Sequence, residues 1–402
     1  MARQNPGPLS GIRVLDVGTN LAGPLGATLM GEFGAEVIKI ELPKIGDTLR
    51  HLPPHYNGKS LNWVVGGRNK KSITLDLRKE KGAQILRLLV KVSDVLVESF
   101  RPGVMEKWRL GYEELQKINP GIIMVRATGF GQDGPYSPRS AFDRIGGAMG
   151  GMTYLTGYPD SAPVRVGLNI CDQITGIFNA LGTVMALYDR DLKSKGQGQW
   201  IDVSLYESIF RLLESVVADY HKLGLIRERV GNANEIVAPA ENFETQDGKW
   251  VCFVIVGEKL FHHALKIMDH LELLNDPRFQ TNNVRVKNRE VLHSIIKEWF
   301  KKRDYSEIHE LFLKEGMPFS LVYSIKDIFD DPHYIARQNI IEINDPQIGP
   351  VKMQNVVPKL SRTPGAVSSS APELGEHNEE VYGNLLGFTK EELKAFREEG
   401  VI

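Results

Sequence analysis

The sequence predicts an α/β protein with a Rossmann-like large domain, built on a parallel sheet, and a smaller α+β domain. Runs rich in β-branched residues alternate with segments of helical periodicity through residues 12–220. Loops that contain glycine or proline separate these segments. Beyond residue 225 the pattern changes to two short strands followed by charged amphipathic helices, which indicates a separate domain.

The expected sheet begins with a β-α-β unit, because residues 12–17 and 36–42 have strand patterns and flank a helical segment. Further strands are predicted at residues 72–77, 94–98, 122–125 and 200–204. A long helix should start near Asp172, and the apolar residues from Ile174 to Tyr188 share one face of it. We expect that face to be buried. A second long amphipathic helix is predicted from Leu205 to Tyr220.

The length of 402 residues is typical of about two to three domains. We predict a large α/β domain over residues 1–225 and a small α+β domain over residues 226–330. A C-terminal segment over residues 331–402 is expected to return to the large domain. Lys plus Arg number 49 and Asp plus Glu number 50, so no global field favours nucleic acid, and no nucleic-acid partner is expected.

Cellular location is predicted from the cysteines and the apolar runs. Cys171 and Cys252 are far apart and form no CxxC pattern, which argues against a disulfide framework. The stretch Met1 to Pro8 lacks the apolar core of a signal peptide. The longest uncharged apolar run, residues 174–188, is shorter than the roughly 20 residues that span a bilayer. We therefore expect a cytoplasmic protein with no membrane partner.

Several familiar site motifs are missing from the sequence. It has no Gly-x-Gly-x-x-Gly after the first strand, no Walker A lysine and no Gly-x-Ser-x-Gly elbow. His262, His263 and His270 have no carboxylate or thiolate at ligand spacing, so no metal site is expected. Cys171 has no histidine nearby in sequence to activate it, and an apolar role is predicted for its thiol.

Four loops lie at strand ends. Residues 20–24, 99–102 and 129–143 follow predicted strands, whereas residues 66–71 precede one. Ligands of open α/β sheets bind outside the carboxyl ends of strands, so three of these loops should converge on one crevice. Their arginines and lysines suit a phosphate-bearing ligand. Asp172 starts a helix after a turn, and that position alone is more typical of a helix cap than of a catalyst.

Short motifs occur in a fixed order along the chain. They include Leu9-Ser10-Gly11-Ile12-Arg13-Val14-Leu15-Asp16, Ala22-Gly23-Pro24, Asn69-Lys70-Lys71-Ser72-Ile73, Phe100-Arg101-Pro102-Gly103-Val104, and Gly129-Phe130-Gly131-Gln132-Asp133-Gly134-Pro135. Weaker matches, such as Asp276-Pro277-Arg278-Phe279, reach into the small domain. In this ordered set the chain resembles the family III CoA-transferases, which include formyl-CoA transferase and carnitine CoA-transferase.

The resemblance implies an enzyme that moves CoA from an acyl-CoA donor to a free carboxylic acid. The CoA thioester is then a substrate, no cofactor is bound permanently, and the intermediates are an aspartyl anhydride and an aspartyl-CoA thioester. Asp172 aligns with the catalytic aspartate. An interlocked homodimer is also implied. The family's CoA-contacting positions fall on Asn20, Leu21, Ala22, Gly67, Arg68, Asn69, Ser99, Phe100, Arg101, Lys107, Arg139, Ser140, Ala141, Phe142 and Asp143.

Within this set, Arg101 and Lys107 would bind the CoA phosphates, and Asn69 and Phe100 would follow the adenosine or the pantetheine. The acceptor is expected to be a dicarboxylate such as succinate, malate or glutarate. Its second carboxylate would pair with one of three arginines, Arg50, Arg144 and Arg165. A helix N-terminus lowers the pKa of a carboxylate and blunts its nucleophilicity, so we expect an oxyanion site that compensates at Asp172.

Two other functions fit the same resemblance. A CoA-ester racemase or epimerase would exchange the α-hydrogen in heavy water. The related racemases carry a histidine two residues before the aspartate that aligns with Asp143. This sequence has Ala141-Phe142-Asp143, without that histidine, which disfavours this function. A non-catalytic acyl-CoA binder would bind the thioester without exchanging its acid. Residues 254–259 contain one glycine where formyl-CoA transferase has several, which disfavours oxalate as a substrate.

Overall fold

The computed structural model describes residues 7–402, so most of the stretch from Met1 to Pro8 lies outside it. The described chain forms two compact units. The first comprises residues 7–152, Arg165–Ala218 and His333–Ile402, and the second comprises Thr153–Val164 and Asp219–Pro332. The second unit therefore differs from the predicted span of residues 226–330, because it also contains a short segment that precedes the Asp172 helix.

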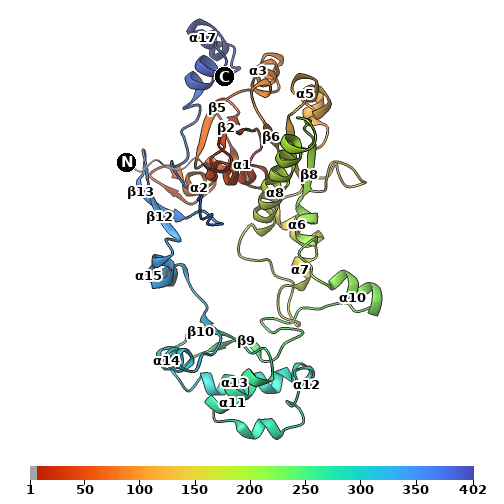
Figure 1. Ribbon diagram of the computed structural model, residues 1–402, viewed down its shortest axis with the longest axis vertical. Coiled ribbons are helices and arrows are strands. Elements are labelled where there is room, and N and C mark those ends of the chain that lie inside the picture. Colours follow the sequence, from red (N-terminus) through yellow and green to blue (C-terminus); the bar gives the residue numbers. More distant parts are fainter. Residues whose placement is uncertain (1–6) are drawn as a thin grey trace. The chain divides into compact units, whose positions relative to one another are not determined.

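A six-stranded parallel sheet forms the centre of the first unit, with the strand order β5-β2-β1-β6-β7-β8 (Figure 1). This order reverses between β1 and β6, as in Rossmann-like sheets. The predicted α/β fold is confirmed, and each predicted strand is present. The strands are β1 (Arg13–Asp16), β2 (Glu36–Glu41), β5 (Lys70–Thr74), β6 (Val95–Glu98), β7 (Ile123–Thr128) and β8 (Trp200–Ser204).

Helices cover both faces of this sheet, which explains the apolar residues on both faces of its central strands, β1, β6 and β7. Helices α3 (Glu80–Lys91) and α5 (Tyr112–Ile118) pack on the face that contains Leu15 and Leu96. The opposite face contains Val14 and Val97 and is covered by α1 (Ala22–Glu32) and α8 (Ile170–Leu192). Successive residues of β1 and β6 thus point into two different cores.

Helices α1 and α8 approach each other closely because small residues line their contact. A Cβ atom on Gly26 would lie 2.8 Å from the Cβ of Asn179, and one on Gly176 would lie 2.7 Å from the side chain of Leu25. The Asn179 amide also donates a 2.9 Å hydrogen bond to the carbonyl of Ala22. The inner face of α8 is therefore small and polar, and it fixes the start of α8 beside the start of α1.

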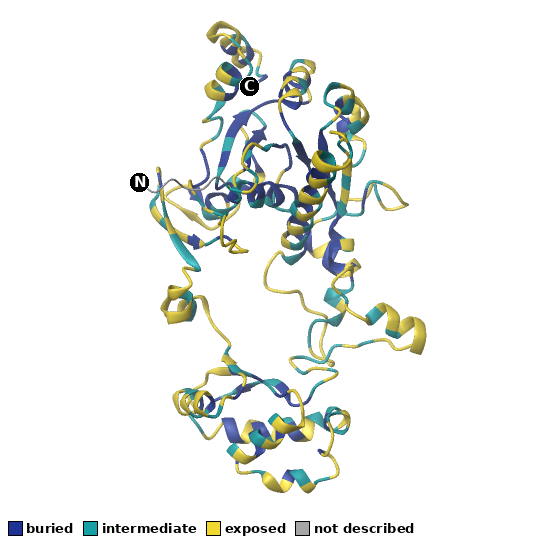
Figure 2. Ribbon diagram, in the orientation of Figure 1, coloured by how far each residue is buried: buried dark blue, intermediate teal, exposed yellow. Residues whose placement is uncertain are grey.

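The predicted burial of the large apolar face of α8 is wrong. We call the residues of this face that are 45–61% exposed the outer stripe, and they are Ile177, Leu181, Val184, Met185 and Tyr188. Figure 2 shows exposed residues along α8. The side that meets α1 has to be small, so the large side chains of α8 turn outward. By length and composition α8 could cross a membrane, but core helices share these properties, and its inner face is packed against α1.

The single long helix predicted from Leu205 to Tyr220 is also wrong. The chain forms α9 (Leu205–Phe210) and α10 (Val216–Leu223), which are separated by a turn. Glu214 in this turn has a φ of 49°, a left-handed conformation that a right-handed helix does not contain. Before the break, Leu205 and Ile209 are buried against Cys171.

The second unit has a three-stranded antiparallel sheet in the order β11-β10-β9, so the predicted α+β pattern is confirmed. Its core is aromatic, and Phe243 stacks on Phe300 with ring centroids 5.0 Å apart. β11 was missing from the sequence prediction. The elements are β9 (Ala240–Glu244), β10 (Trp250–Val254), α11 (Glu258–Ile267), η2 (Leu271–Asn275), α12 (Asn282–Lys287), α13 (Arg289–Phe300), α14 (Tyr305–Glu315), β11 (Phe319–Leu321) and α15 (Ile325–Asp330).

The C-terminal segment packs beside β5 in the first unit. The Tyr382 hydroxyl donates a 2.7 Å hydrogen bond to the carbonyl of Thr74, and the Asp76 amide donates one of 2.8 Å to the carbonyl of Val401. This segment contains α16 (Pro332–Ala336), β12 (Ile340–Asp345), β13 (Gly349–Gln354), the π-helical η3 (Glu379–Leu385) and α17 (Lys390–Glu398). The remaining elements are η1 (Thr48–His51), β3 (His55–Tyr56), β4 (Lys59–Ser60), α2 (Leu61–Gly66), α4 (Val104–Lys107), α6 (Asp143–Met149) and α7 (Met152–Leu155).

Candidate active site

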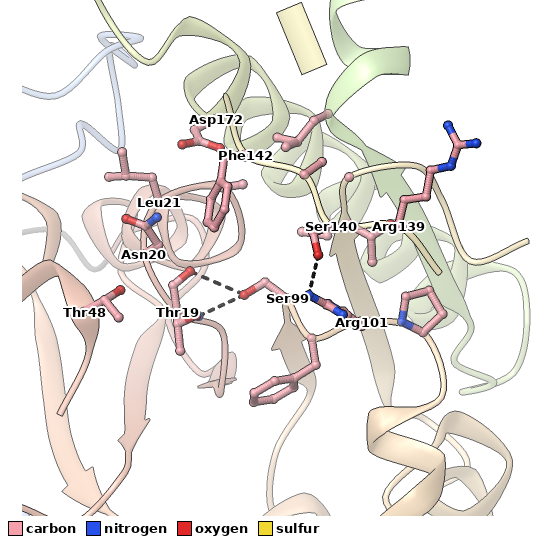
Figure 3. A pocket seen from close by; sticks show the side chains of 18 of the residues that line it. Thr19, Asn20, Leu21, Thr48, Ser99, Arg101, Arg139, Ser140, Phe142 and Asp172 are labelled. Carbon is pink, nitrogen blue, oxygen red and sulfur yellow. Dashed lines mark hydrogen bonds between the residues drawn. The ribbon is translucent and has the colours of Figure 1, made fainter. Parts of the chain in front are cut away.

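A cavity of about 490 Å³ opens at the carboxyl ends of β1, β6 and β7 (Figure 3). The loops that follow these three strands converge there, as the strand pattern predicts, beside the point where the strand order reverses. The walls are formed by Thr19, Asn20, Leu21, Ala22, Thr48, Leu52, Ser99, Phe100, Arg101, Pro102, Ala127, Thr128, Gly129, Ser137, Arg139, Ser140, Ala141, Phe142, Asp172 and Leu205.

Hydrogen bonds hold the loops of this cavity together. The Ser99 hydroxyl accepts a 2.9 Å hydrogen bond from the backbone N–H of Thr19, which joins the loops after β1 and β6 (Figure 3). The Glu98 carboxylate accepts the N–H of Phe100 at 2.7 Å and pairs with Arg126 at 2.8 Å. These contacts within the chain hold the loops after β1 and β6 in place, and those loops form part of the cavity wall.

Asn20 is held in a left-handed conformation, with a φ of 67°. Its backbone N–H donates a 3.0 Å hydrogen bond to Asp47, whose carboxylate pairs with buried Lys39 at 2.8 Å. Asparagine tolerates this conformation better than most residues. The buried ion pair therefore determines where the Asn20 side chain faces the cavity.

Asp172 lies in the first turn of α8, after the N-cap residue Asn169. The residue is only 8% exposed, yet its carboxylate makes no hydrogen bond or ion pair within residues 7–402. Buried carboxylates are usually paired, because an isolated buried charge is costly. This one faces the cavity, so a bound ligand is the available neighbour for it.

The carboxylate that caps α8 belongs to Asp143, the first residue of α6. Its Oδ1 accepts the backbone N–H groups of Cys171 at 2.8 Å and of Asp172 at 3.3 Å. The first N–H groups of a helix have no partner inside the helix, and acidic side chains commonly satisfy them. Asp143 therefore performs the capping role that the sequence position of Asp172 suggested for Asp172.

The predicted lowering of the Asp172 pKa is wrong. Burial raises the pKa of this carboxyl from its usual 3.8 to about 7, and the neighbouring negative charge of Asp143 adds to the effect. Because Asp143 takes the first N–H groups of α8, they do not stabilise the Asp172 charge. Burial also raises the pKa of the Cys171 thiol to about 12, so this thiol is a neutral apolar group rather than a nucleophile.

Arg101 and Arg139 bring positive charge to the cavity wall. The Arg101 guanidinium donates to the hydroxyl of Ser140, so it joins the loops after β6 and β7 (Figure 3). The Arg139 guanidinium stacks over the ring of Tyr136, 3.7 Å from its centroid. In Figure 3 it points away from Asp172. An arginine fork and a nucleophilic acid in one cavity suit an anionic ligand with an electrophilic centre.

Residues 9–378 match the model of CoA-transferase family III. The chain belongs to this family. It is therefore a family III CoA-transferase, and acyl-CoA thioesters and carboxylates are its classes of substrate.

Three relatives of this CoA-transferase cover nearly its whole length. It is 43% identical over 402 residues, all of both chains, to succinyl-CoA–D-citramalate CoA-transferase of Chloroflexus aurantiacus. It is 42% identical to the beta subunit of succinyl-CoA–L-malate CoA-transferase of the same organism, over 98% of each chain. A crystal structure of a CaiB/BaiF family protein from Brucella suis is 31% identical, with a TM-score of 0.84, and the match covers 95% of this chain and 100% of that one.

Some CoA-contacting positions that the resemblance implies lie outside the cavity of the CoA-transferase. The Arg68 guanidinium is buried and pairs with Glu32 at 2.8 Å. The Asn69 amide donates to the carbonyl of Ala366 at 2.7 Å. A Cβ on Gly67 would lie 2.8 Å from the side chain of Ala371. CoA contacts at these three positions stay predictions, and so does one at Lys107, which is exposed at the end of α4.

The positions implied at Asn20, Leu21, Ala22, Ser99, Phe100, Arg101, Arg139, Ser140, Ala141 and Phe142 all line the cavity. Arg50 does not fit the role suggested for a second carboxylate, because it forms two hydrogen bonds to Glu41, of 2.7 and 2.8 Å. Arg144 and Arg165 are exposed. Neither lines the cavity.

Several wall residues were not anticipated from the sequence. Ser137 and Thr128 lie in or beside the loop that follows β7, and their place next to a predicted strand end was a usable signal. Thr48 and Leu52 come from the irregular segment after β2. Nothing in their sequence pattern marks them, because tertiary contacts bring η1 to the cavity.

Proposed function

We propose that this CoA-transferase moves CoA from succinyl-CoA, or a similar dicarboxylic acyl-CoA, to a dicarboxylic acid through covalent intermediates on Asp172. The observation that carries the proposal is the unpaired, nearly buried Asp172 carboxylate in the cavity wall. The names of the two relatives from Chloroflexus support succinyl-CoA as the donor and a hydroxylated dicarboxylate as the acceptor.

The first half of the reaction starts with ionised Asp172. One carboxylate oxygen attacks the thioester carbonyl of the donor, the C–S bond breaks, and CoA thiolate leaves a mixed anhydride on Asp172. The thiolate then attacks the Asp172 carbonyl. This step forms an aspartyl-CoA thioester and releases the donor as a free acid, which carries one oxygen atom from Asp172.

The second half repeats these steps with the acceptor. A carboxylate oxygen of the acceptor attacks the aspartyl thioester, and the thiolate leaves a second anhydride. Attack of the thiolate on the acceptor carbonyl then forms the new acyl-CoA and restores Asp172 with one oxygen from the acceptor. No proton has to be transferred to or from Asp172, which agrees with the absence of a histidine among the cavity residues of the described chain.

The raised pKa of Asp172 favours the first attack, because a more basic carboxylate is a better nucleophile. Each attack also creates a tetrahedral oxyanion. Helix α1 begins at Ala22, in the cavity wall, and no side chain caps it. Its first backbone N–H groups are therefore donors for this oxyanion, and donors of this kind are commonly worth about 3–4 kcal/mol each.

Arg101 is our candidate for a CoA phosphate, because its planar fork lies in the cavity wall and phosphate accepts two parallel hydrogen bonds from such a group. Phe100 beside it packs edge-to-face on Trp108, with centroids 5.1 Å apart, which holds the ring at the cavity. These two side chains would bind the nucleotide part of CoA, while Asp172 meets the thioester.

We also propose that a second subunit covers the outer stripe of α8. Exposed large side chains along several turns of one helix are typical of a subunit interface. The resemblance implies a homodimer, whereas the relative named as a beta subunit works with a different chain by its name. Light scattering of the purified protein alone gives its oligomeric state, and an assay of the same sample gives its activity. A monomer that stays inactive until another chain is added would contradict a homodimer.

The function is tested with a panel of donors and acceptors. Purified protein is incubated with succinyl-CoA and D-citramalate, L-malate, glutarate, acetate or oxalate, and new CoA esters are measured by mass spectrometry. We expect transfer to at least one of D-citramalate, L-malate and glutarate, and little transfer to acetate or oxalate. Transfer confined to monocarboxylates would overturn the dicarboxylate assignment. Hydrolysis or isomerisation of succinyl-CoA without transfer would overturn the proposed reaction.

A further inference from the structure

We propose that Asp143 is a positioning residue for Asp172, which holds the N-terminus of α8 and, through its negative charge, keeps the Asp172 carboxylate reactive. This inference rests on the proposed role of Asp172 as the nucleophile. The resemblance placed Asp143 among the CoA contacts instead. Asp143 is only 8% exposed, its Oδ1 faces the backbone of α8, and it does not line the cavity.

The position of Asp143 in the chain links two parts of the site. The loop that contributes Ser140, Ala141 and Phe142 to the cavity wall ends at Asp143. Its carboxylate then accepts two N–H groups from the first turn of α8. One side chain therefore fixes the distance between the wall that faces CoA and the residue that attacks its thioester.

Asp143 also determines the electrostatic environment of Asp172. If the Asp172 carboxylate accepted the N–H groups of its own helix, they would stabilise its charge and lower its pKa. Asp143 occupies these donors and leaves its own negative charge beside Asp172. Burial and this charge together raise the pKa of Asp172. The acid that attacks is thereby kept more basic than an ordinary aspartate.

The other ionisable groups near Asp172 do not provide this effect. Cys171, its neighbour on α8, is neutral because burial raises the pKa of its thiol to about 12. Helix α1 brings only apolar and small residues and Thr28 to this end of α8, and α9 brings Leu205. Three further charged groups have partners away from Asp172. Glu207 of α9 accepts a hydrogen bond from Ser204, Arg126 of β7 pairs with Glu98, and Asp202 of β8 accepts the N–H of Gln132. Arg101 lies across the cavity and is bonded to Ser140.

The test separates the charge of Asp143 from its capping bonds. Asp143→Asn keeps an oxygen that can accept both N–H groups but removes the charge. Asp143→Ser is a second neutral variant with a good helix cap, and Asp143→Ala removes both properties. Asp133→Asn is the matched control, because it removes one exposed charge from the same loop.

In Asp143→Asn we expect the acidic limb of kcat/KM against pH to move down by roughly half to one pH unit, since one of two causes of the raised pKa is lost. At pH 8 we expect kcat to fall about 3- to 10-fold, because a less basic nucleophile attacks more slowly. Asp143→Ser should move the limb in the same direction, and Asp143→Ala should add a lower melting temperature. Asp133→Asn should leave the limb in place.

A direct titration keeps this proposal distinct from the proposed function. Carbon-13 NMR of carboxyl-labelled aspartate follows Asp172, whose signal is assigned by its loss in Asp172→Asn. A lower titration midpoint in Asp143→Asn supports the inference, and an unchanged or higher midpoint overturns it. If Asp172→Asn keeps full transferase activity, the proposed function fails instead, and the NMR midpoint still decides the electrostatic role of Asp143.

Discussion

Two buried aspartates at the carboxyl ends of the same sheet have opposite surroundings. Asp16, at the end of β1, is fully buried and pairs with Lys70 at 2.8 Å and with Lys39 at 3.5 Å. Asp172 is nearly as buried and has no cation within hydrogen-bonding distance in the described chain. Burial is common to both residues, so burial alone does not mark a functional acid. The feature that marks a functional acid here is the absence of a pairing cation beside the buried carboxylate.

The buried ion pairs around Asp16 have a structural role. We call the residues that form them the paired group, and they are Asp16, Lys39, Asp47 and Lys70. Lys39 also pairs with Asp47. Asp47 accepts the backbone N–H of Asn20, so this ion pair holds the part of the cavity wall that Asn20 forms. Removing one member of such a group leaves a buried charge uncompensated. An unpaired buried acid destabilises the folded chain, and groups of this kind are concentrated at functional sites.

The largest effect is expected from Asp172→Asn, which replaces the proposed nucleophile with a neutral amide of the same shape. Transferase activity should fall at least about 10³-fold, because losing the nucleophile of a covalent mechanism commonly costs that much or more. Steady-state rates with succinyl-CoA measure this. Asp133→Asn, the exposed control, should stay within about twofold of the wild type. Activity above a tenth of the wild-type value would show that Asp172 is not the nucleophile.

The paired group should respond in stability instead. We expect Lys39→Met to destabilise the first unit by about 3–5 kcal/mol, since it leaves Asp16 and Asp47 short of a cation in the interior. Urea unfolding followed by circular dichroism measures this loss. Lys44→Met, a change at an exposed loop lysine, is the matched control. A loss below about 1 kcal/mol would show that the paired group contributes little to folding.

Asp172→Asn should change stability in the opposite direction, and only at higher pH. The folded pKa of about 7 lies above the usual 3.8, so ionisation of Asp172 opposes folding. This cost begins near pH 4, grows as the pH rises to 7, and is complete above it. Asp172→Asn should therefore be more stable than the wild type by about 1–4 kcal/mol at pH 8 and equal to it near pH 4. Melting curves at both pH values provide the comparison.

A smaller effect is expected from Arg101→Lys, which keeps the charge in the cavity but removes the planar fork. The KM for succinyl-CoA should rise about 10-fold while kcat changes less, because the lost hydrogen bonds hold CoA in both the ground state and the transition state. A selective loss of kcat would place Arg101 at the reacting thioester rather than at a phosphate.

The sheet could be predicted from sequence because its central strands carry apolar residues on both faces and glycine-containing loops separate the segments. The faces of α8 could not, since periodicity reveals an apolar stripe but not which neighbour it meets. Gly176 and Asn179 admit α1 closely, and that contact decides which side is buried. The cap from Asp143 joins residues 28 and 29 positions apart, a tertiary contact that no local pattern encodes.

The most direct measurement is mass spectrometry of the enzyme after incubation with succinyl-CoA and no acceptor. The mixture is quenched in acid and digested at low pH, which preserves a thioester. We expect the peptide containing Asp172 to carry CoA joined through the Asp172 carboxyl group, and we expect this adduct to disappear when a dicarboxylic acceptor is added before the quench. CoA on another residue, or transfer at full rate with no adduct at any time, would contradict this expectation.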